Sequence, residues 1–155
     1  MLVTVEISNE QDDFAIDESG LERIARFVLA AEGTDEDAEL SVGIVGEARM
    51  TELNEKYAGQ SGPTDVLAFA YDEFDEERQQ DTEEPVLLGD VVLCPAVAAR
   101  NAAEYESAVD RELELLLVHG LLHLLGYDHV DTEEEEAMRF RQSELIERFS
   151  AGGSQ

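Results

Sequence analysis

The chain contains three histidines, and all of them lie in the stretch VHGLLHLLGYDHVD, residues 118–131. His119 and His123 are four residues apart in a segment that we expect to be helical, so both imidazoles lie on one helical face, close enough to share one cation. Gly126 can adopt the left-handed conformation that ends a helix, which lets His129 turn back toward the same point. Three neutral imidazoles in this arrangement predict a zinc site.

Three protein ligands leave one tetrahedral position of zinc open, which is typical of a catalytic site. A water in that position has its pKa lowered to about 7, so it supplies a hydroxide nucleophile at neutral pH. Cys94, the only cysteine, would close the site as a fourth ligand. A single cysteine at the end of a strand is more often a small buried apolar group. We therefore predict one catalytic zinc per chain, bound by His119, His123 and His129.

The spacing of these histidines is also that of the metzincin proteases, which carry a glutamate directly after the first histidine as general base. Gly120 occupies that position here and cannot transfer a proton, so the sequence does not favour a peptidase.

Three other carboxylates are candidates for the base, and each has a structural alternative. Asp128 would support a metal ligand or a turn, Glu112 would be a solvated charge two turns before His119, and Asp65 would brace a turn at the start of a strand. The sequence identifies no base among them. A phosphodiester with its own 2′-hydroxyl nucleophile needs mainly charge stabilisation by the metal.

The charge balance is extreme, with 38 acidic and 10 basic residues and a formal net charge of −28. Such a surface repels polyanions and acidic lipid, so composition alone argues against nucleic-acid binding. It resembles an adaptation to a salty cytoplasm. The longest uncharged run, residues 115–127, is too short to span a bilayer, and the single cysteine fits a reducing compartment. We expect a soluble cytoplasmic protein that does not bind membranes.

The length of 155 residues favours one domain, expected over residues 1–149 with a flexible tail at 150–155. Residues 72–84 are dominated by acids and predict an exposed loop. A capping box of Thr132 and Glu135 predicts the start of the last helix. Hydrophobic periodicity predicts strands at 2–7, 39–45, 64–71 and 86–94, and helices within 19–33, 47–59, 95–105, 110–125 and 132–149. This order predicts an α+β fold, in which a small mixed sheet of about four strands packs with about five helices and the zinc site lies on the central helix and the following turn, as in zincins.

Three blocks of the sequence resemble one known family. HGLLHLLGYDH (119–129) is similar to the signature of the YbeY endoribonucleases, which are bacterial rRNA maturation factors. GPTDVLAF (62–69) matches an upstream block of that family, with Ala68 where serine is usual, and GDVVLCP (89–95) matches a third. The resemblance runs from about Leu53 to Tyr127 and beyond.

This resemblance implies a zinc-dependent endoribonuclease specific for single-stranded RNA. It implies a role in maturation of the 3′ end of 16S rRNA and in ribosome quality control, with precursor rRNA and the small ribosomal subunit as partners and no DNA substrate. Carried over by position, the metal ligands are His119, His123 and His129, and Thr64 and Asp65 help to shape the cleft.

One position departs from the family pattern. Many members have an arginine, proposed to contact RNA, directly after the aromatic residue that matches Tyr57; this chain has Ala58 instead. Arg49, Lys56 and Arg100 are candidates to replace it, although each is more often an ordinary solvated charge on a helix. Two other functions stay open: a non-catalytic ribosome assembly factor stabilised by zinc, and a metal-dependent hydrolase of another substrate.

Overall fold

The computed structural model describes residues 3–34, 37–70, 86–104, 108–127 and 131–153. The order of strands and helices is the one expected from the sequence. The acidic segment 72–84 lies outside the described residues. The strands are β1 (Val3–Asn9), β2 (Ala38–Ile44), β3 (Val66–Ala70) and β4 (Val86–Leu93); the helices are α1 (Glu18–Ala31), α2 (Glu47–Leu53), α4 (Pro95–Glu104), α5 (Val109–Leu124) and α6 (Thr132–Arg148), with π-helical turns η1 (Asn54–Ala58) and η2 (Phe149–Gly153).

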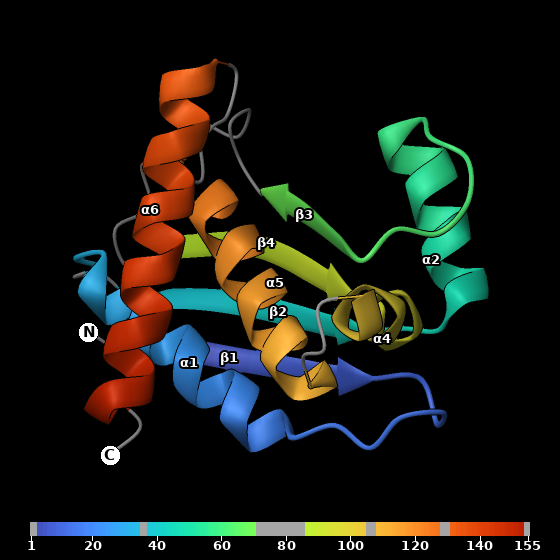
Figure 1. The fold of residues 1–155 in the computed structure, drawn as a ribbon, viewed down its shortest axis with the longest axis horizontal. Coiled ribbons are helices and arrows are strands. Elements are labelled where there is room, and N and C mark those ends of the chain that lie inside the picture. Colours follow the sequence, from blue (N-terminus) through green and yellow to red (C-terminus); the bar gives the residue numbers. More distant parts are fainter. Residues whose placement is uncertain (1–2, 35–36, 71–85, 105–107, 128–130, 154–155) are drawn as a thin grey trace.

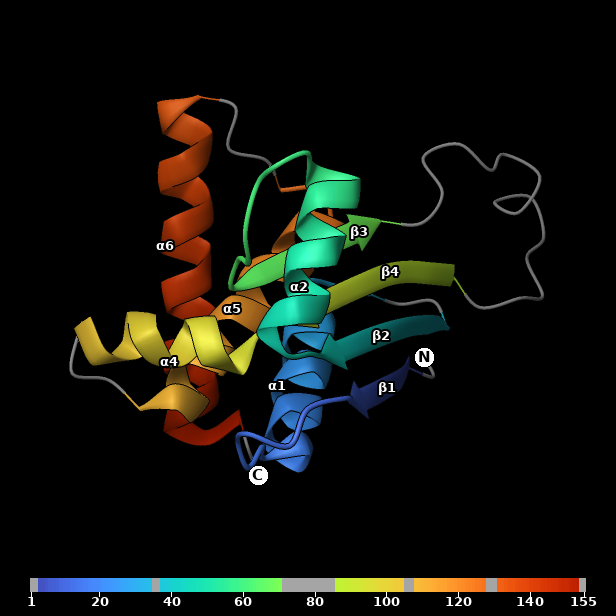
Figure 2. The same ribbon diagram turned by 90° about the vertical axis from the view of Figure 1, so that its right-hand side faces the viewer.

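The four strands form one sheet in the order β1-β2-β4-β3. β2 runs parallel to both β1 and β4, whereas β3 pairs antiparallel with β4, with Val66 opposite Leu93 and Ala70 opposite Gly89. The mixed sheet expected from the sequence is therefore confirmed, and β3 is an edge strand. In Figure 1, β3 lies between α5 and α6 on one side and α2 on the other; α2 faces the viewer in Figure 2.

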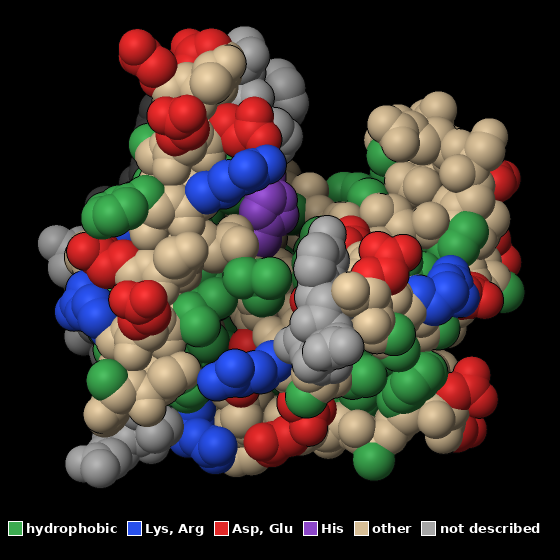
Figure 3. Space-filling view, in the orientation of Figure 1, with side chains coloured by type: hydrophobic (Ala, Val, Ile, Leu, Met, Phe, Trp, Pro, Cys, Tyr) green, Lys and Arg blue, Asp and Glu red, His purple; other side chains and the backbone are tan. Residues whose placement is uncertain are grey.

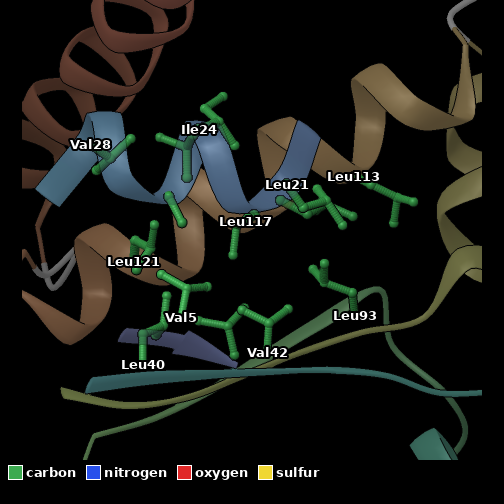
Figure 4. Packing of buried hydrophobic residues seen from close by; sticks show 14 of the residues in the cluster. Val5, Leu21, Ile24, Val28, Leu40, Val42, Leu93, Leu113, Leu117 and Leu121 are labelled. Carbon is green, nitrogen blue, oxygen red and sulfur yellow. The ribbon is translucent and has the colours of Figure 1, made fainter. Parts of the chain in front are cut away.

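Helices α1 and α5 lie side by side on one face of the sheet, and their apolar side chains meet those of the strands (Figure 4). Alternate residues of each strand point to this face, as strand geometry requires. Burial of these side chains is the main force that holds α5 against the sheet. The fully buried set includes Ile24, Val28 and Leu29 of α1, Leu40 and Ile44 of β2, and Leu113, Leu117, Leu121 and Leu122 of α5.

Helix α2 packs against the opposite face of the sheet, at the β3–β4 side. Val92 points to this face because Val91 and Leu93 point to the first, and it packs with Met50 of α2 and with Cys94. Beyond Leu53 the helix continues as the π-helical turn η1 and ends at Gly59, whose φ of 68° is left-handed. The expected end of the helix at Gly59 is confirmed, although its last five residues are not α-helical.

The start of α6 differs from the expectation. Asp131, not Thr132, is the N-cap, and its carboxylate accepts a hydrogen bond from the backbone N–H of Glu134 at 2.8 Å. The expected capping box is therefore wrong by one residue, because aspartate caps a helix as well as threonine does and Thr132 is the first helical residue. Among the described residues, no helix has the length and apolar character needed to cross a membrane.

Candidate metal centre and the cleft around it

Helix α5 places His119 and His123 on one face, half-buried and beside the edge strand β3. Their ring centroids are 4.7 Å apart, and their Nε2 atoms are 3.2 Å apart. Figure 3 shows histidine at the rim of a hollow that separates the α6 side of the molecule from the α2 side. The pocket at the histidines is lined by Val66, Leu67, Ala68, His119, Gly120, His123, Gly126 and Tyr127.

The separation of the two Nε2 atoms fits a shared metal ion. Zinc binds imidazole nitrogen at about 2.0–2.1 Å, so two nitrogens on neighbouring tetrahedral positions lie about 3.3 Å apart. The observed 3.2 Å between His119 and His123 agrees with that value. His129 lies outside the described residues, and within them no group of three His, Cys, Asp or Glu side chains is placed to hold a metal. The described part of the site thus contains two of the three expected ligands.

Gln142 of α6 orients the first histidine. Its Oε1 lies 3.1 Å from Nδ1 of His119. Because an amide oxygen only accepts, this hydrogen bond requires Nδ1 to carry the proton, which leaves the lone pair of Nε2 directed at the metal position. Sequence reasoning missed Gln142, since it lies 23 residues away on another helix, and only the packing of α6 against α5 reveals it.

The turn after α5 has the hydrogen bonds of a Schellman motif. The N–H of Gly126 donates to the carbonyl of His123 at 3.1 Å, and the N–H of Tyr127 donates to the carbonyl of Leu122 at 2.9 Å. Gly126 has a φ of 102°, a conformation that L side chains rarely adopt. The glycine cap expected from the sequence is confirmed, and it lies three residues before His129 in the sequence.

A polar network anchors this turn to the neighbouring helices. The hydroxyl of Tyr127 donates to the carboxylate of Glu32 at 3.0 Å, and Nε of Arg141 lies 2.7 Å from the same carboxylate. Burial and then the hydrogen bond to Glu32 raise the pKa of Tyr127, so the phenol stays protonated. Arg141 also pairs with Glu144, and these carboxylates raise its pKa. This network links three parts of the fold: Glu32 at the end of α1, Tyr127 in the turn after α5, and Arg141 in α6. Tyr127 is two residues before His129 in the sequence.

Thr64 and Asp65 lie immediately before β3. The carboxylate of Asp65 accepts hydrogen bonds from Nδ2 of Asn101 at 3.1 Å and from Oγ1 of Thr64 at 3.4 Å, and its backbone carbonyl accepts one from the N–H of Cys94. These contacts brace the start of β3 against α4. Neither residue is among the described residues that line the histidine pocket, although Val66, which directly follows, is.

The other candidate base and the candidate fourth ligand have different surroundings. Burial and the charge of Asp65 raise the pKa of Glu112, which does not line the histidine pocket. Cys94 is fully buried beside Met50 and Val92, and burial raises the pKa of its thiol. The interpretation of Cys94 as a small buried apolar group is confirmed. Asp128 lies outside the described residues.

Comparison with known proteins gives four concordant matches. A family model described as Endoribonuclease YbeY matches residues 6–150. A protein of Frankia casuarinae named Endoribonuclease YbeY is 47% identical over 147 residues, covering 93% of this chain and 73% of the relative. A protein of the same name from Thermobifida fusca is 43% identical, covering 93% and 92%. The solution structure of TM1509 from Thermotoga maritima superposes with a TM-score of 0.60 at 26% identity, covering 97% of this chain and 95% of that one.

These matches extend well beyond the three motif blocks. The family match begins in β1 and ends in η2, so it includes the β1–α1–β2 portion that the motifs leave out. The similarity therefore covers the α1–α5 layer and the sheet as well as the histidines.

Proposed function

The chain belongs to the YbeY endoribonuclease family, and we propose that it is a zinc-dependent member that cleaves single-stranded RNA. Family membership supports endoribonuclease activity in general, and RNA is then the substrate. Family membership does not by itself include zinc dependence. We propose it because the Nε2 atoms of His119 and His123 are 3.2 Å apart, as two ligands of one zinc would be.

In this proposal His119, His123 and His129 hold the zinc, and each residue has a defined task. When bound, zinc supplies positive charge for the scissile phosphodiester and lowers the pKa of a water at the open position. Gln142 holds the proton of His119 on Nδ1, so that Nε2 carries the lone pair that binds the metal. Gly126 and the Tyr127–Glu32 hydrogen bond fix the position of the chain up to two residues before His129.

The finer biological role rests on the family resemblance of the motifs. We propose that the enzyme matures the 3′ end of 16S rRNA, takes part in ribosome quality control, and acts in the cytoplasm on the small ribosomal subunit. Thr64 and Asp65 contribute to the cleft indirectly, by fixing the start of β3, whose residues Val66 and Ala68 line the histidine pocket.

A cleavage assay tests the proposal. Purified, zinc-loaded protein is incubated with a single-stranded RNA and with the same sequence as a duplex, with and without a chelator. We expect cleavage of the single strand alone, lost with the chelator and restored by zinc. Protein that carries zinc but leaves RNA intact, while a folded His123→Ala variant still supports ribosome assembly in cells, would instead identify a non-catalytic assembly factor.

A further inference from the structure

Tyr57 is a large aromatic side chain that the fold leaves open. It is 59% exposed on the π-helical turn η1, where its ring meets the edge of Phe69 of β3 at a centroid distance of 5.5 Å and an angle of 68°. Both rings line a groove of about 500 Å³ between α2–η1 and the outer face of the sheet, together with Leu53 and Arg49. The fold therefore supports this ring from one side without covering it.

The position of Tyr57 is held by its surroundings. Asn54, which is only 5% exposed, donates a hydrogen bond from Nδ2 to the carbonyl of Gly62 at 2.8 Å, so the loop after η1 is tied back to the start of η1. Gly59 ends η1 in a left-handed conformation. A ring on such a supported turn loses little conformational freedom when a planar ligand stacks on it.

Strand β3 connects this ring to the histidines. Ala68 lines the histidine pocket, and its neighbour Phe69 contacts Tyr57. Successive residues of a strand are about 3.3 Å apart and point to opposite faces, so the two sites lie on the two sides of one short edge strand. An extended polymer bound at the histidines would have to pass over β3 to contact Tyr57.

Few positive charges near Tyr57 are available for phosphate contacts. The Nζ of Lys56 lies over one face of the Tyr57 ring, 5.1 Å from its centroid, so a base stacks on the other face, and Arg49 is paired with Glu52 at 3.1 Å. Ala58, the residue after Tyr57, carries no charge, and the chain has a net charge of −28. Phosphate contacts also weaken steeply as salt rises, whereas base stacking involves no counterion release.

We propose that Tyr57, braced by Phe69, stacks on a nucleobase of the single-stranded RNA substrate next to the histidine site. This inference rests on the proposed function and adds to it a residue that determines specificity. A stacked base must be unpaired to present its face, so the contact favours single strands over duplexes. Stacking also gives an acidic protein a means of holding RNA that survives high salt.

The test measures binding without cleavage. Zinc-loaded protein is titrated with a 2′-O-methyl RNA of about 10 nucleotides that contains 2-aminopurine, whose fluorescence is quenched on stacking. Tyr57→Ala is expected to weaken binding roughly 5- to 150-fold and to abolish the quenching. Tyr57→Phe should retain both. Phe140→Ala is the matched control, because Phe140 is 71% exposed but lies on α6 and does not line the groove; it should leave binding unchanged.

Salt separates stacking from charge. The loss in Tyr57→Ala should be the same at about 0.1 and 2 M KCl, whereas any loss in Lys56→Ala should vanish at the higher concentration. Wild-type affinity in a folded, zinc-loaded Tyr57→Ala variant would overturn the stacking role while leaving RNA cleavage by the wild type intact. A Tyr57→Ala loss confined to low salt would also overturn it. If the wild type neither binds the probe nor cleaves unmodified RNA, the proposed function fails as well.

Discussion

Gly120 of α5 lies against Val91 of β4 so closely that a Cβ atom on Gly120 would be 2.9 Å from Cγ1 and 3.2 Å from Cγ2 of Val91. Gly120 directly follows His119, so this contact fixes how near the histidine-bearing helix lies to the sheet. The close packing of α5 on β4 thus requires a residue without a side chain at position 120. Proteases with the same histidine spacing carry their catalytic glutamate at this position.

Substitution of Gly120 is expected to destabilise the fold. In Gly120→Ala, overpacking costs typically 1–3 kcal/mol and outweighs the gain in helix propensity of about 1 kcal/mol. Gly43→Ala is the matched control, because its Cβ would lie at an ordinary 3.9 Å from Val92. Denaturant unfolding of both variants measures the difference, and equal stability of Gly120→Ala and the wild type would contradict the close approach. Gly120→Glu should be less stable still, because its side chain is larger. Neither Gly120→Glu nor the wild type should cleave casein-like proteins.

The hydrogen bond between His119 and Gln142 predicts a change in metal affinity. Gln142→Leu removes the acceptor of the Nδ1 proton, and loss of such outer partners typically lowers metal affinity 10- to 100-fold. Gln142→Glu retains an acceptor and should bind zinc at least as tightly as the wild type. Competition with a chromogenic chelator measures the affinity. The metal-free proteins provide a second measurement, because NMR of the imidazole nitrogens should show the Nδ1–H form of His119 in the wild type and a mixture in Gln142→Leu. Identical tautomer populations and affinities would remove Gln142 from the site.

Glu112 predicts a pH dependence of stability. Burial and the charge of Asp65 raise its pKa in the folded state, so the ionised form opposes folding at neutral pH and this penalty disappears as pH falls through the raised pKa toward the ordinary value. Glu112→Gln should therefore raise the melting temperature at pH 7, with a gain that shrinks to nothing near about pH 4. Glu136→Gln removes the same charge from an exposed position of α6 and is the control. A gain for Glu112→Gln that is independent of pH would show that packing, not ionisation, is responsible.

The net charge of −28 predicts that salt stabilises the fold. Screening weakens the mutual repulsion of 38 carboxylates, because the Debye length falls to about 3 Å at 1 M salt. The melting temperature should rise between roughly 0.05 and 2 M KCl, and RNA binding should weaken less than it does for a basic protein, or strengthen. A flat or falling melting temperature, together with a steep loss of RNA binding, would point instead to a basic face.

Local sequence patterns predicted the helices and strands well, because the start, end and buried face of an element depend mainly on residues near one another in the sequence. Pro95 begins α4, where its missing N–H costs nothing, and the leucine-rich pattern placed α5 within one residue of its observed bounds. The π-helical turn η1 was not predicted, since it accompanies the hydrogen bond of the buried Asn54 to Gly62, which no periodicity encodes.

The sequence predicted only part of the site, because the rest depends on contacts between segments that are distant in the sequence. The histidine spacing indicated the metal position, because an i, i+4 pair shares one helical face. The partners that orient the site depend on how α6 and α1 pack against α5: Gln142 is 23 residues from His119, and Glu32 is 95 residues from Tyr127. The hydrogen bond between Asp65 and Asn101 of α4 likewise joins residues that are 36 positions apart in the sequence.

Zinc titration of the metal-free protein tests the central claim most directly, namely that the α5 histidines hold the metal of an RNA-cleaving enzyme. Zinc is added stepwise while bound zinc and single-stranded RNA cleavage are measured together, in the wild type and in His123→Ala. We expect about one zinc per chain, cleavage that rises in proportion to it, and a folded His123→Ala variant that loses most of both. Wild-type protein that binds no zinc under replete conditions, or that cleaves RNA at full rate without it, would contradict the account.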